Sequence, residues 1–141
     1  MNKIEHSNFK RLIGVWKTIG YIKSGQDNLR LIGTDSYELI LDGNCILHKA
    51  DVKIGNDRSE TFEIIKLDSP SDKAKMQYFN ANGEDGIMTS SIANNQFKIE
   101  GAGLKFNGVI NNENTEIIGK WYIQTENGEW TDFIELNLLK K

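Results

Sequence analysis

Apolar and polar residues alternate in short runs along most of the chain, and glycine, asparagine and aspartate separate the runs. Alternation with a period of two between such turn residues is typical of antiparallel strands with one buried face. The pattern begins at Val15 and continues to the C-terminal end, and it predicts an all-β fold of about ten strands. We expect the meander to close into one up-and-down antiparallel β-barrel, because closure removes exposed sheet edges.

The residues before Val15 follow a different pattern. Ser7 is a suitable N-cap for a short helix from Asn8 to Ile13, and Gly14 is a suitable C-terminal stop. Phe9 and Leu12 give this helix an apolar side. Because one or two turns of helix are not stable alone, we expect it to pack against one end of the barrel and plug it.

The turns predict which residues face inward, because partners across a hairpin point to the same side of the sheet. Asp42-Gly43 has the composition of a type I′ turn, which places Tyr37 opposite His48. The same register places Asp35 opposite Ala50. Further turns are predicted at Gly55 to Arg58, Asn82-Gly83, Asn94-Asn95, Asn111 to Asn114 and Asn127-Gly128.

These turns extend the inward face around the whole chain. They predict an apolar base near the plugged end, made of Leu39, Leu41, Ile46, Leu67, Ile92, Phe97, Ile110, Ile117, Leu136 and Leu138. The inward positions above this base are more polar. On the outer face the same alternation leaves large apolar side chains, which predict a self-association patch and a weak homodimer. They are Tyr78, Ile87, Ile118, Tyr122 and Phe133.

The chain resembles the calycin superfamily, whose small barrels include lipocalins and fatty-acid-binding proteins. It looks closest to the uncharacterised bacterial lipocalin-like domains of that kind. The resemblance is carried by Leu12-Ile13-Gly14-Val15-Trp16, by Tyr37-Glu38-Leu39-Ile40-Leu41-Asp42-Gly43, and by Gly119-Lys120-Trp121 with Gly128-Glu129-Trp130. It implies that Trp16 packs at the closed end of the barrel, under a cation supplied by Lys140 or Lys141.

Length, charge and cysteine content limit the classes of function. We expect residues 1–141 to form one domain. A net charge of −3 argues against the basic surface that nucleic acid requires. No apolar run is long enough to span a bilayer, and the N-terminal stretch lacks an apolar leader. With a single cysteine, Cys45, these features predict a cytoplasmic protein that contacts neither nucleic acid nor membrane.

Four polar residues are predicted to converge inside the barrel: Asp35, Tyr37, His48 and Glu63. Unpaired carboxylates are costly to bury, so these groups must pair with each other, hold water or meet a ligand. The main hypothesis is a lumen that binds a small, mostly apolar molecule carrying a polar group. The residues expected to line this site are Asp35, Tyr37, His48, Glu63, Gln77, Met88, Ser90, Trp121, Trp130 and Asp132.

Two alternatives use the same residues differently. In a small isomerase- or cyclase-like enzyme, His48 would act as a general base or acid, oriented by Glu63 or Asp35, while Tyr37 stabilised an oxyanion. In a structural or interaction barrel, the polar residues would only fix the register of a packed interior. No residue is assigned as catalytic. We expect neither a metal nor a cofactor, because HExxH, CxxC and P-loop patterns are missing from the sequence.

Overall fold

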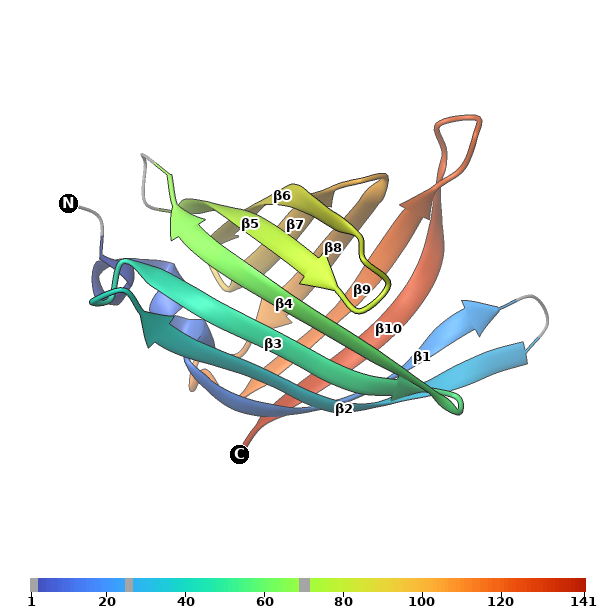
Figure 1. The fold of residues 1–141 in the computed structure, drawn as a ribbon, viewed down its shortest axis with the longest axis horizontal. Coiled ribbons are helices and arrows are strands. Elements are labelled where there is room, and N and C mark those ends of the chain that lie inside the picture. Colours follow the sequence, from blue (N-terminus) through green and yellow to red (C-terminus); the bar gives the residue numbers. More distant parts are fainter. Residues whose placement is uncertain (1–2, 25–26, 69–71) are drawn as a thin grey trace.

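The computed structural model describes residues 3–24, 27–68 and 72–141, and these residues form a closed barrel of ten antiparallel strands (Figure 1). Each strand pairs with its neighbours in sequence, and β1 pairs with β10 to close the ring. The predicted all-β, up-and-down topology is therefore confirmed. The strands are β1 (Gly14–Ser24), β2 (Asp27–Ile40), β3 (Cys45–Ile54), β4 (Asp57–Leu67), β5 (Lys73–Asn80), β6 (Asp85–Ala93), β7 (Gln96–Gly101), β8 (Leu104–Ile110), β9 (Glu116–Gln124) and β10 (Trp130–Lys140).

The N-terminal segment forms two short 3-10 helices, η1 (Ile4–His6) and η2 (Asn8–Leu12), at one end of the barrel (Figure 1). The Ser7 hydroxyl accepts a hydrogen bond from the backbone N–H of Phe9 at 3.2 Å, as expected of the cap. Phe9 and Leu12 are fully buried in the core. None of the described helices is long and apolar enough to cross a membrane.

Two cationic side chains fasten this end of the barrel. Arg11 of η2 donates from Nε to Asn114 Oδ1 at 2.6 Å and from Nη2 to Asn95 Oδ1 at 2.8 Å, which ties the helix to two loops. Lys140 Nζ lies 4.8 Å from the centre of the Trp16 ring. The cation that the calycin resemblance implied over Trp16 is thus Lys140.

Two loops differ from the predicted ones by two residues, which leaves the inward face unchanged. The β3–β4 turn contains only Gly55 and Asn56, so His48 pairs with Glu63; the predicted four-residue loop would have placed His48 opposite Ile65. Gly55 has a φ of +60° at the first central position, where a II′ turn requires it. At the β8–β9 loop, Asn111 pairs with Glu116, which brings Phe106 opposite Trp121 rather than Gly119.

The β5–β6 loop is one residue longer than predicted, so the side chains of β5 face the opposite sides of the sheet from those predicted. Asn80 Oδ1 accepts the backbone N–H groups of Asn82 and Glu84, both at 3.1 Å, and Gly83 has a φ of +81°. The loop therefore has three residues rather than two. Gln77 was predicted to face inward, but it is exposed, as is Phe79 two residues later on the same face. Tyr78 was predicted outside, but it packs against the core, so the predicted outer patch loses it.

The tip of the β9–β10 hairpin is also turned over. Trp121 pairs with Ile134 as predicted, but a β-bulge at Phe133 changes the pairing nearer the turn. Asp132 pairs with Tyr122 on the outer face, where its carboxylate lies 3.3 Å from Lys23 Nζ. The prediction that Asp132 points into the lumen is wrong.

Trp130 lies beyond the same bulge and is outside as well. Its ring lies under Lys105 Nζ, 4.4 Å away, and Lys105 also lies over Tyr122 on the outer face. The predicted lumenal position of Trp130 is therefore also wrong. The bulge keeps the Asp132 carboxylate out of the lumen, where an unpaired charge would be costly.

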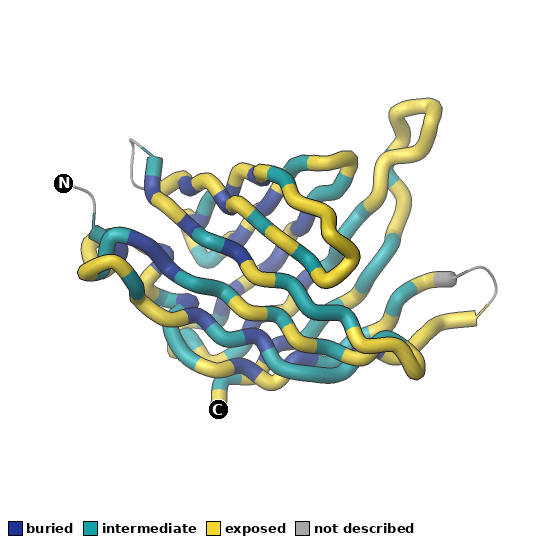
Figure 2. The backbone as a smooth tube through the Cα atoms, in the orientation of Figure 1, coloured by how far each residue is buried: buried dark blue, intermediate teal, exposed yellow. Residues whose placement is uncertain are grey.

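The buried residues concentrate toward the plugged end (Figure 2). Most of the predicted apolar base is buried there, but Leu39 and Leu41 next to the β2–β3 turn are exposed. Leu41 has a φ of +53° within this turn, so it cannot continue the inward alternation of β2. The predicted loop around Pro70 lies outside the described residues.

Candidate functional site

Three adjacent strands bring three ionisable side chains into contact on the inner wall. His48 on β3 is directly opposite Glu63 on β4, and Asp35 on β2 is its diagonal neighbour. His48 Nδ1 lies 2.9 Å from Glu63 Oε1, and His48 Nε2 lies 2.6 Å from Asp35 Oδ1. The predicted convergence of these residues is confirmed, and the imidazole bridges the two carboxylates.

Tyr37 holds the imidazole in this orientation. It is directly opposite His48, and the two rings stack with centroids 4.1 Å apart and planes 5° from parallel. Stacking on the face leaves both ring nitrogens free to point along the ring edge toward the carboxylates. The second Asp35 oxygen accepts a short hydrogen bond from the Thr18 hydroxyl on β1. All four predicted residues and Thr18 therefore belong to one network, which we call the lumenal cluster.

The bonding pattern makes His48 a cation. Each ring nitrogen faces a carboxylate oxygen, which accepts hydrogen bonds and has no proton of its own to donate when ionised. Burial alone would lower the pKa of His48, but hydrogen bonds to Asp35 and Glu63, together with their charges, raise that pKa to about 10. With two carboxylates and one imidazolium, the formal charge of the lumenal cluster is −1.

Two polar atoms of the cluster remain unpaired and open. Neither the Tyr37 hydroxyl nor Glu63 Oε2 has a hydrogen-bond partner among the described residues. Among the described residues, Asn137 Oδ1 is the one side-chain polar atom that is both buried from solvent and without a hydrogen-bond partner, so neither lumenal atom is buried in this sense. The two lumenal atoms are therefore accessible to solvent. Burial, then the charges of Asp35 and Glu63, raise the pKa of Tyr37 well above its ordinary value, so its hydroxyl remains a donor.

The other predicted site residues are divided between the two faces. Met88 and Ser90 on β6 are buried inside, and Trp121 on β9 contacts Phe106 at 5.3 Å between ring centres. Ser90 donates its hydroxyl proton to the Lys98 backbone carbonyl at 2.9 Å, so it has no proton left for a ligand. Gln77, Trp130 and Asp132 lie outside, as described above.

Thr18 was missed by the sequence interpretation, although a signal was present. Trp16 is inward in β1, so Thr18, two residues later, must share its face. Thr18 pairs with Gly33, which is two residues before Asp35 and therefore on the same face of β2. The two-residue spacing from Trp16 could therefore have placed a hydroxyl next to the predicted carboxylate.

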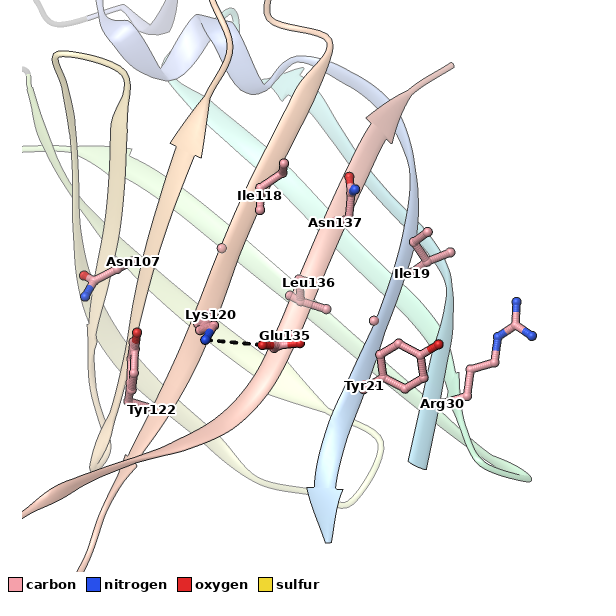
Figure 3. A pocket seen from close by; sticks show the side chains of 12 residues that line it. Ile19, Tyr21, Arg30, Asn107, Ile118, Lys120, Tyr122, Glu135, Leu136 and Asn137 are labelled. Carbon is pink, nitrogen blue, oxygen red and sulfur yellow. Dashed lines mark ion pairs between the residues drawn. The ribbon is translucent and has the colours of Figure 1, made fainter. Parts of the chain in front are cut away.

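A separate hollow of about 530 Å³ lies on the outer wall across β1, β8, β9 and β10 (Figure 3). Its outward side chains include Tyr21, Ile118 and the Lys120–Glu135 ion pair, whose charged atoms are 3.3 Å apart. Gly108 and Gly119 point inward in this wall, and a Cβ at either position would lie within 2.6 Å of the Phe106 ring. The missing side chains let the wall approach Phe106 closely. The sequence interpretation did not identify this hollow.

Similar folds occur among solved structures. Rv2717c from M. tuberculosis superposes with a TM-score of 0.70 at 10% sequence identity, over 93% of each chain. The S-type phycobiliprotein lyase CPES from Guillardia theta superposes with a TM-score of 0.67 at 9% identity, over 99% of this chain and 93% of that one. At these identities the likeness shows the fold alone.

No protein-family model matches the chain, and no curated protein matches its sequence.

Proposed function

We propose that the barrel binds a small, mostly apolar molecule in its lumen and holds the polar end of that molecule at the lumenal cluster. The observation that carries the proposal is the pair of open, unpaired atoms, the Tyr37 hydroxyl and Glu63 Oε2, on the inner wall of the barrel. A few polar groups at the base of an apolar cavity is the usual form of a small-molecule site. We further propose that the chain is a lipocalin-like member of the calycin superfamily.

Apolar residues of the opposite wall support this proposal. Met88, Ile99 and Phe106 are buried on β6 to β8, and Trp121 is partly buried on β9. These strands complete the ring opposite β2 to β4. The fold likeness to a phycobiliprotein lyase also favours a ligand-binding barrel. A bilin is one example of a small molecule of the proposed kind.

The proton-transfer alternative has weaker support. A general base needs a nitrogen lone pair, but both His48 nitrogens donate to carboxylates. With a pKa of about 10, the imidazolium is also a poor acid at neutral pH. Its bonding suits a fixed charge better than a proton carrier.

The experiment is a fluorescence titration with N-phenyl-1-naphthylamine, a neutral apolar dye. Ala50 is inward, half-buried and directly opposite Asp35, so Ala50→Trp fills the lumen at the cluster. We expect the wild-type protein to bind the dye and Ala50→Trp to bind it at least about tenfold more weakly, because the bulk occupies the site. Ala50→Leu, which adds less bulk, should show a smaller loss.

Ile87→Trp is the matched control, because Ile87 is 62% exposed on the outer face. It should bind the dye like the wild type. Circular dichroism and thermal melting identify any variant that fails to fold. Equal dye affinity in folded Ala50→Trp and wild-type protein would refute a lumenal site, and so would failure of the wild type to bind the dye.

A further inference from the structure

The charge of the inner wall differs from what a carboxylate ligand requires. Among the inward positions of the described strands, the cationic side chains are His48 and Lys140. Both ring N–H groups of His48 already donate hydrogen bonds, one to Asp35 and one to Glu63. Lys140 is at the plugged end, over the Trp16 ring. The described lumen therefore offers no unused cation that could meet an anionic headgroup.

Acidic groups remain available instead. Glu63 Oε2 is unpaired and open, and the lumenal cluster has a formal charge of −1. An anionic headgroup beside it would be repelled in a partly desolvated site. A protonated nitrogen would neutralise the cluster and form a charge-assisted hydrogen bond, which is stronger than a neutral one.

The Tyr37 face does not change this preference. Its hydroxyl stays protonated, so it can donate to a ligand or accept from one. Its ring is already covered on one side by His48, at 4.1 Å between ring centroids. A polar group that meets both open atoms must at least donate to Glu63, which has no proton to give in return.

We propose that the lumen selects apolar molecules whose polar end is a nitrogen-borne hydrogen-bond donor, best a protonated amine that bonds to Glu63 Oε2. This inference rests on the proposed function, because it assumes that the lumen admits a ligand. It separates the protein from barrels that bind fatty acids by their carboxylates.

The test is displacement of N-phenyl-1-naphthylamine at pH 7 by dodecylamine, dodecanol and dodecanoate, which share one chain and differ in the headgroup. We expect dodecylamine to displace the dye at about a tenfold lower concentration than dodecanoate, with dodecanol between them. Equal or better displacement by dodecanoate in the wild type would overturn the inference. That comparison needs no variant.

Glu63→Gln should remove most of the preference for the amine, because the amide carries no charge. Glu135→Gln is the matched control, since Glu135 is an exposed carboxylate on the outer wall, and it should keep the preference. Retention of the preference in folded Glu63→Gln would also overturn the inference. If the dye binds and Ala50→Trp weakens it, the proposed function stands even when the headgroups do not differ; if the dye does not bind, the proposed function fails first.

Discussion

At the scale of single residues, His48 determines the chemistry of the inner wall. Asp35 and Glu63 lie at the two edges of its ring, and Tyr37 covers one face. Removing the imidazole would leave two carboxylates facing each other with no cation between them. Breaking one partner out of a buried ion pair typically costs about 3–5 kcal/mol of folding free energy. We therefore expect His48 to stabilise the folded protein as well as to form part of the site.

Stability should depend on pH through His48. Its pKa is raised from 6.5 to about 10 in the folded protein, so the folded state binds the extra proton in that interval. The stabilisation is complete below pH 6.5 and is lost as the pH rises through 10. We expect the free energy of unfolding to fall by up to about 1.4 kcal/mol per pH unit across this window, as measured by urea denaturation.

Variants separate this effect from other titrations. His48→Gln should be less stable at pH 7 and should lose the slope between pH 6.5 and 10. Asp51→Asn removes an exposed carboxylate paired with Arg58 and should keep the slope. The raised pKa of Tyr37 acts above pH 10, outside the window. A wild-type stability that is flat from pH 6.5 to 10 would show that His48 is not held as a cation.

At the scale of elements, loop length determined which sequence predictions succeeded. A register error of two residues at Gly55-Asn56 left the facing of β4 intact, so Glu63 was still placed inside. A register error of one residue at the β5–β6 loop reversed β5 and moved Gln77 outside. The composition Asn-Gly indicated a turn there, but the side-chain bonds of Asn80 that lengthen the loop could not be deduced from it.

The β10 bulge has no comparable sequence signal. The three-residue tip ending at Gly128 and the extra residue at Phe133 offset each other, so the rest of β10 has the predicted register. Only the short segment between them, with Trp130 and Asp132, faces the other way. The site was predictable where strands β2 to β4 meet, because two-residue periodicity and paired turns agreed there. It was not predictable where one extra residue had to be placed.

Arg11 provides a test of how the plug is attached. Its guanidinium bonds to Asn114 and Asn95 from two different loops. A hydrogen bond to a charged group contributes about 1.5–3 kcal/mol to stability. Arg11→Ala should therefore lower the free energy of unfolding by an amount of that order. The adjacent exposed Lys10 is the matched control, and Lys10→Ala should change stability by less than about 0.5 kcal/mol. Equal losses in the two variants, measured by urea denaturation, would show that Arg11 does not fasten the plug.

At the scale of the whole molecule, the proposed lumenal site and the outer hollow lie on different parts of the barrel. The lumenal cluster is on the inner face of β2 to β4, while the outer hollow is lined by Tyr21, Ile118 and Asn137 on the outer face of β1, β9 and β10 (Figure 3). The predicted homodimer patch is weakened by the inward position of Tyr78. Its members Ile87 and Ile118 are on β6 and β9, which are not neighbours in the ring. Self-association therefore stays a prediction.

Nuclear magnetic resonance can locate the site at which a ligand binds. Backbone amide chemical shifts of the 15N-labelled protein can be followed during titration with N-phenyl-1-naphthylamine. We predict that the largest changes map to the inner wall, at Asp35, Tyr37, Ala50 and Glu63. Changes confined to the outer hollow, at Tyr21, Ile118 and Asn137, would show that the ligand does not bind in the lumen.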